Sequence, residues 1–222
     1  MRNGLQFIVM IVYSLSLVQF ARGQETAVKF DMARLYEEKK LTIVNRKASL
    51  ERDASKDYIV VNEDLEEGLV WLDGISFSEG TIEIDLKGQD VFQHSFLGIA
   101  FHGENDSTFD AVYFRPFQFQ TADSVRKTRG VQYVSLPKNT WQVLREKHPG
   151  VYEKTVQPAP DPNNWFHAKM VVRKNTLQVY VDDSPAPCLT VDLIGKREGG
   201  RIALYTADRS GGSFTNLSIK RN

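Results

Sequence analysis

The stretch that decides the fold is Asn164–Val181 (NWFHAKMVVRKNTLQVYV), which leads to residues 199–206 (GGRIALYT) and 212–220 (GSFTNLSIK). β-Branched and aromatic residues dominate each piece, as is typical of strands. Residues 174–176 (KNT) separate two apolar runs and favour a hairpin turn, and two glycine pairs mark further breaks. This end of the chain therefore predicts antiparallel strands and an all-β domain.

Strand signals continue through the rest of the chain at intervals of roughly ten residues, which is the spacing of a β-sandwich or jelly roll. Helix signals are sparse: Met32–Lys39 is a candidate short helix, and Thr140–Lys147 fits either a helix or a strand. Because no long helix separates the strands, we expect an antiparallel two-sheet jelly-roll sandwich rather than a parallel α/β fold. The other candidate strands are Leu41–Asn45, Tyr58–Asn62, Gly68–Leu72, Thr81–Lys87, Phe96–His102, Ala111–Arg115 and Val131–Ser135.

The N-terminus has the features of an export signal. Arg2 supplies a positive charge, and Leu5–Val18 is almost wholly apolar and uncharged, yet shorter than the roughly 20 residues that a membrane span needs. Residues 21–23 (ARG) then offer small side chains to a signal peptidase. We predict cleavage after Gly23, with a retained anchor as the alternative. The mature chain is then one jelly-roll domain over residues 24–222 that lacks a membrane span and acts in the periplasm or outside the cell.

The charge of the chain is balanced, with 28 Lys and Arg residues against 28 Asp and Glu residues. Cleavage removes Arg2 and Arg22 and leaves 26 basic against 28 acidic residues, a net charge of −2. This balance lacks the basic excess that binding to nucleic acid or to an anionic membrane requires. The single cysteine, Cys188, cannot form an internal disulfide, and its position beside a short apolar strand predicts a packed small hydrophobe.

Aromatic, arginine and amide side chains gather in the middle of the chain. Tyr113 and Arg115 lie on the same side of one predicted strand because side chains alternate. Aromatic rings cover the apolar face of a pyranose, and guanidinium and amide groups meet its hydroxyls. We interpret the group as a saccharide site; the alternative is that the rings belong to the core and the arginine is structural. The predicted ligand-binding residues are Tyr113, Arg115, Gln132, Trp141 and Arg145, with His102 at the rim.

Paired carboxylates raise the question of glycoside hydrolysis, which uses two of them. Glu83 and Asp85 lie on one face of a strand, roughly 6.6 Å apart along it. The tract resembles the start of the family 16 glycoside hydrolase signature, but Lys87 and Gly88 stand where that signature has a third acid. We therefore interpret the pair as the solvated face of a strand. The other candidates for a catalytic acid or base are Asp110, Glu153, His102 and His148.

Metal-binding signals are weak. The four histidines show no tight ligand spacing, so they predict no metal site. Asp182 and Asp183 follow a strand, and paired carboxylates at a sandwich edge can help to hold calcium. A simple turn is the other interpretation of this pair. We expect no cofactor, with a structural calcium ion at this turn as the alternative.

The closing strands resemble those of concanavalin A-like jelly rolls. Trp165–Val181, Gly199–Thr206 and Phe214–Lys220 are similar to a pattern of core residues and turns in laminin G-like modules and in bacterial 3-keto-disaccharide hydrolase-like domains. Phe77–Lys87 and Phe96–Phe101 resemble earlier strands of the same fold. The resemblance covers most of residues 68–221, and it implies a concanavalin A-like sandwich.

The resemblance also bears on function. Residues 113–116 (YFRP) are similar to the FRP segment on the concave side of the hydrolase-like members, which implies that Arg115 faces a sugar site. The first hypothesis is therefore an exported, monomeric domain that binds carbohydrate on its concave face. The alternatives are a glycoside hydrolase or lyase acting on 3-keto-glycosides, and a laminin G-like module that binds a protein through its rim loops.

Overall fold

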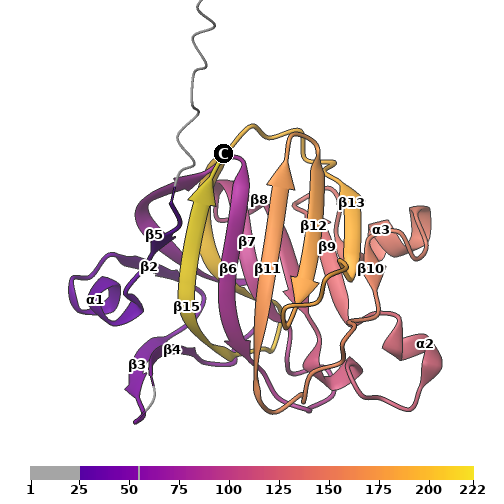
Figure 1. Cartoon of the computed structure of the whole chain (residues 1–222), viewed down its shortest axis with the longest axis horizontal. Helices are drawn as coiled ribbons and strands as arrows, with labels where there is room; N and C mark the ends of the chain where they lie inside the picture. The colour runs from indigo at the N-terminus through magenta and orange to yellow at the C-terminus, as the bar shows by residue number, and fades with distance from the viewer. Residues whose placement is uncertain (1–25, 55) are drawn as a thin grey trace, which may run out of the picture.

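The computed structural model describes residues 26–54 and 56–222, so the predicted export signal lies outside the described residues. Two antiparallel sheets face each other in this structure (Figure 1). The expected two-sheet sandwich is confirmed. Among the residues described, no helix is long and apolar enough to span a lipid bilayer.

The first sheet contains the closing strands of the chain. Its strands are β1 (Val28–Lys29), β3 (Ala48–Arg52), β4 (Asp57–Val61), β6 (Gly80–Lys87), β11 (Trp165–Arg173), β12 (Thr176–Val181), β13 (Leu189–Asp192) and β15 (Gly212–Arg221). They are ordered β13-β12-β11-β6-β15-β4-β3, and β1 pairs with β15. β11 and β12 form the predicted hairpin, with Lys174 at positive φ in the turn. The sequence pattern does not predict β3, because its five residues contain neither an aromatic side chain nor a β-branched one.

The second sheet carries the strands from the middle of the chain. Its strands are β2 (Leu41–Val44), β5 (Gly68–Phe77), β7 (Leu97–Asn105), β8 (Thr108–Phe114), β9 (Val131–Ser135), β10 (Glu153–Lys154) and β14 (Gly200–Thr206). They are ordered β10-β9-β8-β7-β14-β5-β2. This order makes β8 and β9 neighbours, so the polar residues predicted on the two strands lie side by side.

Helical segments are short and lie outside the two sheets. They are α1 (Met32–Glu37), the 3₁₀ helix η1 (Pro116–Gln118), α2 (Ser124–Lys127) and α3 (Trp141–Lys147). The α3 segment, which fits a helix or a strand by sequence, is a helix because the Thr140 side chain caps its N-terminus by accepting a hydrogen bond from the Val143 amide. In Figure 1, α2 and α3 project from the side of the sandwich where β9 and β10 lie.

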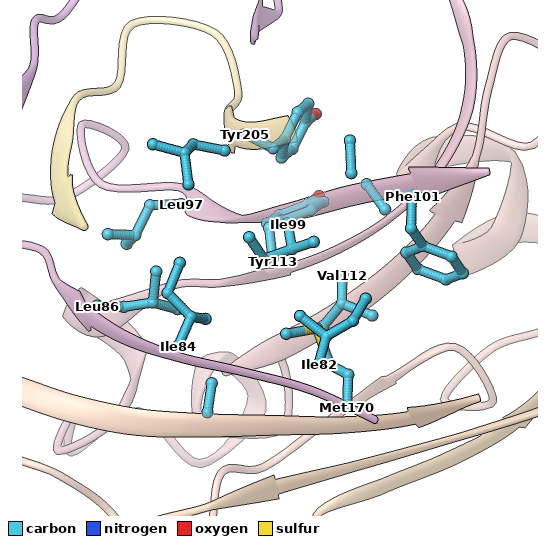
Figure 2. Close-up of a cluster of buried hydrophobic side chains, with 14 of the residues drawn as sticks. Ile82, Ile84, Leu86, Leu97, Ile99, Phe101, Val112, Tyr113, Met170 and Tyr205 are labelled. Carbon is cyan, nitrogen blue, oxygen red and sulfur yellow. The ribbon is translucent and has the colours of Figure 1, made fainter. Parts of the chain in front are cut away.

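Alternating apolar residues on the facing sides of the sheets form the core. Ile82, Ile84 and Leu86 of β6 are fully buried. Figure 2 shows them opposite Ile99 and Val112 of the second sheet. Burial of each such side chain contributes about 1.5–3 kcal/mol to folding, so this apolar contact holds the two sheets together.

The second sheet is also buried on the face that points away from the core. The register aligns Gln132, Tyr113, Gly98 and Tyr205 in one row across four strands, and residues in such a row share a face. Because Gly98 has no side chain, the rings of Tyr113 and Tyr205 approach to 5.8 Å between centroids. A Cβ at Gly98 would overlap the carbonyl oxygen of Val112. This row of residues is the floor on which the candidate site is built.

Candidate functional site

A groove lies over the outer face of the second sheet, above Tyr113 and Tyr205. Its volume is about 420 Å³, within the usual range for a small-molecule site. Residues from the β6–β7 connection, the η1–α2 segment, helix α3 and the loop after β14 form its walls. Segments that are far apart in the sequence therefore meet around one hollow.

Arg115 stands at the end of the floor, where β8 gives way to Pro116 and helix η1. Its Nη2 donates to the Tyr113 hydroxyl at 3.0 Å and to Gln132 Oε1 at 3.2 Å, while Nη1 donates to the Arg129 carbonyl at 2.7 Å. The guanidinium carbon also lies 5.0 Å from the centre of the Tyr113 ring, a cation–π contact. These contacts hold the guanidinium in one orientation at the edge of the groove.

Glu153 on β10 is the acid that balances this arginine, and it serves two others as well. Arg145 of α3 donates to both carboxylate oxygens, at 2.8 and 2.6 Å. Arg115 Nη1 and Arg129 Nε each lie 3.8 Å from a Glu153 oxygen. We call Arg115, Arg129 and Arg145 the arginine cluster. Three guanidiniums thus share one buried carboxylate at the groove.

Aromatic rings are exposed on both sides of the groove. Trp141, at the start of α3, is 40% exposed, and Phe92, in the β6–β7 connection, is 52% exposed. An arginine carbon lies over each ring, Arg145 at 4.6 Å from Trp141 and Arg126 at 5.0 Å from Phe92. Large apolar rings that stay exposed at the edge of a hollow are a mark of a binding site.

Gln118 of η1 lines the groove and carries an unpaired polar atom. The residue is only 5% exposed, and its side-chain oxygen Oε1 has no hydrogen-bond partner in the described structure. An unpaired buried acceptor costs about 1–3 kcal/mol, so native proteins seldom keep one without a use. The oxygen itself is shielded from solvent, so it can accept from a ligand hydroxyl in the groove once the side chain rotates toward the ligand.

Glu67 is a groove residue that the sequence pattern does not single out, because it lies in the loop before β5. Its carboxylate accepts a short hydrogen bond from the Tyr205 hydroxyl. Burial raises the pKa of Glu67, and this effect outweighs the stabilisation of its charge by Tyr205 and Arg46. Burial also raises the pKa of Tyr205, and the nearby Glu67 charge adds to that shift.

The raised pKa of Glu67 makes stability depend on pH. The pKa of Glu67 is higher in the folded protein than the usual 4.5 of an unfolded chain. Its contribution to the free energy of unfolding is therefore fully present below pH 4.5 and is lost as the pH rises through the folded pKa. We expect Glu67→Gln, which cannot ionise, to gain stability relative to the wild type from about pH 4.5 upward. Thermal melts across this range check the prediction. Glu66→Gln, an exposed neighbour, is the matched control; equal pH profiles for the wild type and Glu67→Gln would contradict the assignment.

Four of the six predicted ligand-binding residues line the groove: Tyr113, Arg115, Trp141 and Arg145. Gln132 does not line it, because its side chain lies behind Arg115 and its amide donates to the carbonyls of Tyr133 and Tyr152. It supports the arginine instead.

His102 does not line the groove either. Its backbone has a positive φ of 52° at an irregularity in the register of β7, which takes the side chain out of the strand alternation. The imidazole is buried, with Nδ1 3.2 Å from Asp110 Oδ2 and Nε2 2.7 Å from the Ser78 carbonyl oxygen. The predicted rim position is therefore corrected to a buried one.

Asp110 is the centre of this second polar cluster. It is fully buried on the core side of β8 and accepts hydrogen bonds from the Tyr133 hydroxyl at 2.9 Å and from Arg197 Nη1 at 3.0 Å. Arg197 also donates to Ser135 Oγ and to the Leu136 carbonyl. The cluster ties the loop before β14 to the edge of β8 and β9, which is a structural role.

None of the four candidate catalytic residues lines the groove. Asp110 and His102 are held in the buried cluster, and Glu153 is held by the arginine cluster. His148, at the end of α3, is exposed and has its ring 5.7 Å from that of Tyr152. On the first sheet, Asp85 is bound to His167 Nδ1 at 2.8 Å and to Asn216. The groove therefore offers Glu67 as its half-buried acid.

The described residues contain no group of three or more His, Cys, Asp or Glu side chains placed to hold a metal ion. Asp182 and Asp183 form a turn at positive φ after β12, and Asp182 accepts a hydrogen bond from the His167 amide. Cys188 donates from its Sγ to the Val179 carbonyl at 3.4 Å, and burial raises the pKa of its thiol to about 12. Such a thiol is not a nucleophile near neutral pH.

No family model matches this chain, and no curated protein is significantly similar to it in sequence. Its structure is similar to that of the carbohydrate-binding module CBM66 from Bacillus subtilis, with a TM-score of 0.55 and 15% identity over 82% of this chain and 95% of that one. The chain has the concanavalin A-like jelly-roll fold.

Two further solved structures agree with this assignment. A protein of unknown function with a galectin-like fold from Bacillus subtilis gives a TM-score of 0.53 at 11% identity, over 82% of this chain and 90% of that one. The exoplasmic/lumenal domain of VIP36, in its Ca²⁺-bound form, gives 0.50 at 12% identity, over 82% and 84% of the two chains. Identities this low establish the fold alone, so the function has to be argued from the groove.

Proposed function

We propose that this domain binds a saccharide in the groove over the outer face of the second sheet, the face expected to be concave. The observation that carries the proposal is the pairing of two exposed rings, Trp141 and Phe92, with the unpaired oxygen of Gln118 in one hollow. A sugar has both an apolar ring face and hydroxyl donors, so it complements both features at once.

Each groove residue has a distinct part in this binding mode. Trp141 or Phe92 stacks on a sugar ring, while Gln118 Oε1 accepts from a hydroxyl. Arg115 and Arg145 donate to ring substituents from fixed positions, because Gln132 and Glu153 hold their guanidiniums. CBM66, which has a similar fold, is by its name a carbohydrate-binding module, and this similarity supports the proposal.

Binding on a glycan array, followed by calorimetry, tests the proposal. We expect Trp141→Ala and Arg115→Ala each to weaken binding of the captured glycan by about 1–3 kcal/mol, roughly tenfold to a hundredfold. Trp165→Ala, on the first sheet, is the matched control and keeps the affinity. If no glycan binds the wild type, or if the groove variants bind as tightly as the control, the proposal fails.

A glycoside hydrolase or lyase is the second candidate, because Glu67 brings an acid of raised pKa to the groove. A carboxyl that stays protonated can serve as a general acid toward a glycosidic oxygen. Turnover of a panel of oligosaccharides and 3-keto-glycosides, measured with the wild type and with Glu67→Gln, decides between binding and catalysis. If the Glu67→Gln variant keeps the turnover of the wild type, the Glu67 carboxyl does not take part in catalysis.

We further propose that the domain acts after export, as a monomer that has lost residues 1–23. The support is the apolar stretch Leu5–Val18 with its following small residues. N-terminal sequencing of the exported protein checks the site, with Gln24 expected as the first residue. If the exported protein still contains residues 1–23, the alternative is correct, and this segment is a retained anchor.

A further inference from the structure

The groove has an excess of positive charge at one end. Five arginines line it, and three of them have a close acid: Arg126 pairs with Asp123, Arg145 with Glu153 and Arg209 with Asp208. The other two are in longer contact with Glu153 alone. The arginines are Arg115, Arg126, Arg129, Arg145 and Arg209. The whole chain has equal numbers of basic and acidic residues, so the local excess of positive charge results from the way the fold places these side chains.

The arginine cluster is where this excess is least compensated. Glu153 is engaged by Arg145 through two hydrogen bonds, so its carboxylate is already committed. Arg115 and Arg129 both lie 3.8 Å from it, beyond hydrogen-bonding distance. One negative charge among three positive ones leaves two guanidinium charges unneutralised at this point.

These guanidiniums can be reached from the groove. The side chains of Arg129 and Arg145 are 32% and 25% exposed, and both residues line the hollow. Arg145 also lies 4.6 Å from the centre of the Trp141 ring, so a sugar that reaches past the edge of this ring has its substituents near the guanidinium. The planar fork of arginine pairs with carboxylate and sulfate oxygens better than with a neutral hydroxyl.

We infer that the saccharide of this groove is anionic, with a carboxylate or sulfate group seated on the arginine cluster beside Trp141. This inference rests on the proposed function and names its ligand class. Both anionic groups share the chemistry that the cluster recognises: a compact set of oxygens that carries negative charge. Neutral sugars bind more weakly, because they leave the charge of Arg115 and Arg129 uncompensated when they displace water from the groove.

Calorimetry on the full chain with three probes tests the inference. The probes are oligogalacturonate, its fully methyl-esterified form, and a sulfated oligosaccharide built from uncharged sugars. The first two have the same sugar chain, and the methyl ester removes the charge of each carboxylate. We expect at least one of the acidic probes to bind about tenfold or more tightly than the ester. Affinity for that probe falls as NaCl is raised from about 50 mM to about 500 mM, since salt screens the attraction.

Arg129→Gln locates the effect. We expect it to weaken binding of the preferred acidic probe about tenfold while leaving binding of the ester unchanged. Arg173→Gln, an exposed arginine at the end of β11 on the first sheet, is matched in charge and changes neither. Circular dichroism of each variant shows whether it is folded.

The outcomes separate this inference from the proposed function. Preference for oligogalacturonate or for the sulfated probe supports it and distinguishes carboxylate from sulfate. Equal binding of the ester, or capture of neutral glycans alone on an array, overturns the inference and leaves saccharide binding intact. If no glycan of any charge binds, both the inference and the proposed function are rejected.

Discussion

Replacement of Asp110 by alanine is expected to lower the free energy of unfolding by about 3–5 kcal/mol, because it removes the buried acid of an ion pair and leaves Arg197 with only the exposed carboxylate of Glu104 as a counter-charge within 4 Å in the described part of the chain. Asp110 is fully buried and accepts hydrogen bonds from Tyr133 and Arg197. The Arg197 side chain is only 10% exposed, so solvent compensates little for the lost carboxylate, and its remaining acid, Glu104, is 58% exposed. Equilibrium unfolding in urea measures the change.

Two further variants make this result specific. Asp57→Ala removes an acid of an exposed pair with Arg52, and we expect a change within about 1 kcal/mol. Asp110→Asn keeps the shape and one acceptor oxygen, and should fall between the wild type and Asp110→Ala. A loss below about 1 kcal/mol for Asp110→Ala would show that the buried cluster does not hold the loop before β14 in place.

Replacement of Glu153 by glutamine is expected to have two opposite effects. Stability should fall by about 3 kcal/mol, because Glu153 is the one carboxylate within 4 Å of the arginine cluster among the described residues. Affinity for an acidic saccharide should rise by about tenfold, since the three guanidiniums are left with no internal counter-charge. Urea unfolding and calorimetry with oligogalacturonate measure the two effects on one preparation.

Glu146→Gln is the matched control for this change. Glu146 belongs to α3 next to Arg145 but is exposed, so its loss should alter stability by less than about 0.5 kcal/mol. If Glu153→Gln binds the acidic saccharide no more tightly than the wild type, the negative charge of Glu153 does not oppose binding of the ligand. The charge argument for an anionic ligand would then be wrong.

The sequence predicts the fold well because the fold depends on local patterns. Alternation along β6, β11 and β12 places apolar side chains on one face, and turn residues end each strand. The same reasoning puts Tyr113 and Arg115 on one side of a predicted strand, and both residues line the groove, although β8 ends one residue before Arg115. Local patterns do not predict a strand with weak β propensity, such as β3.

The site is predictable only where it depends on one strand or one helix. The alternation of side chains along the predicted strand does not give the position of His102. An irregularity in the register of β7 directs its imidazole toward Asp110 in the buried cluster. Glu67, Phe92 and Gln118 come from three separate connections, and only the packing of the sheets brings them together. No spacing in the chain carries that information, because the contacts join loops rather than neighbouring residues.

The most direct test of saccharide binding in the groove uses the three tryptophans as reporters of three places in the molecule. Trp71 is buried, with its indole nitrogen donating to Asp106; Trp165 lies on the first sheet beneath Lys56; Trp141 lines the groove. Each gives one indole signal in a proton–nitrogen correlation spectrum, and Trp141→Phe assigns the groove signal. In a titration with the glycan that binds most tightly by calorimetry, we predict a saturable shift of the Trp141 signal alone. A shift of the Trp165 signal instead, or no shift of any of the three, would contradict the account.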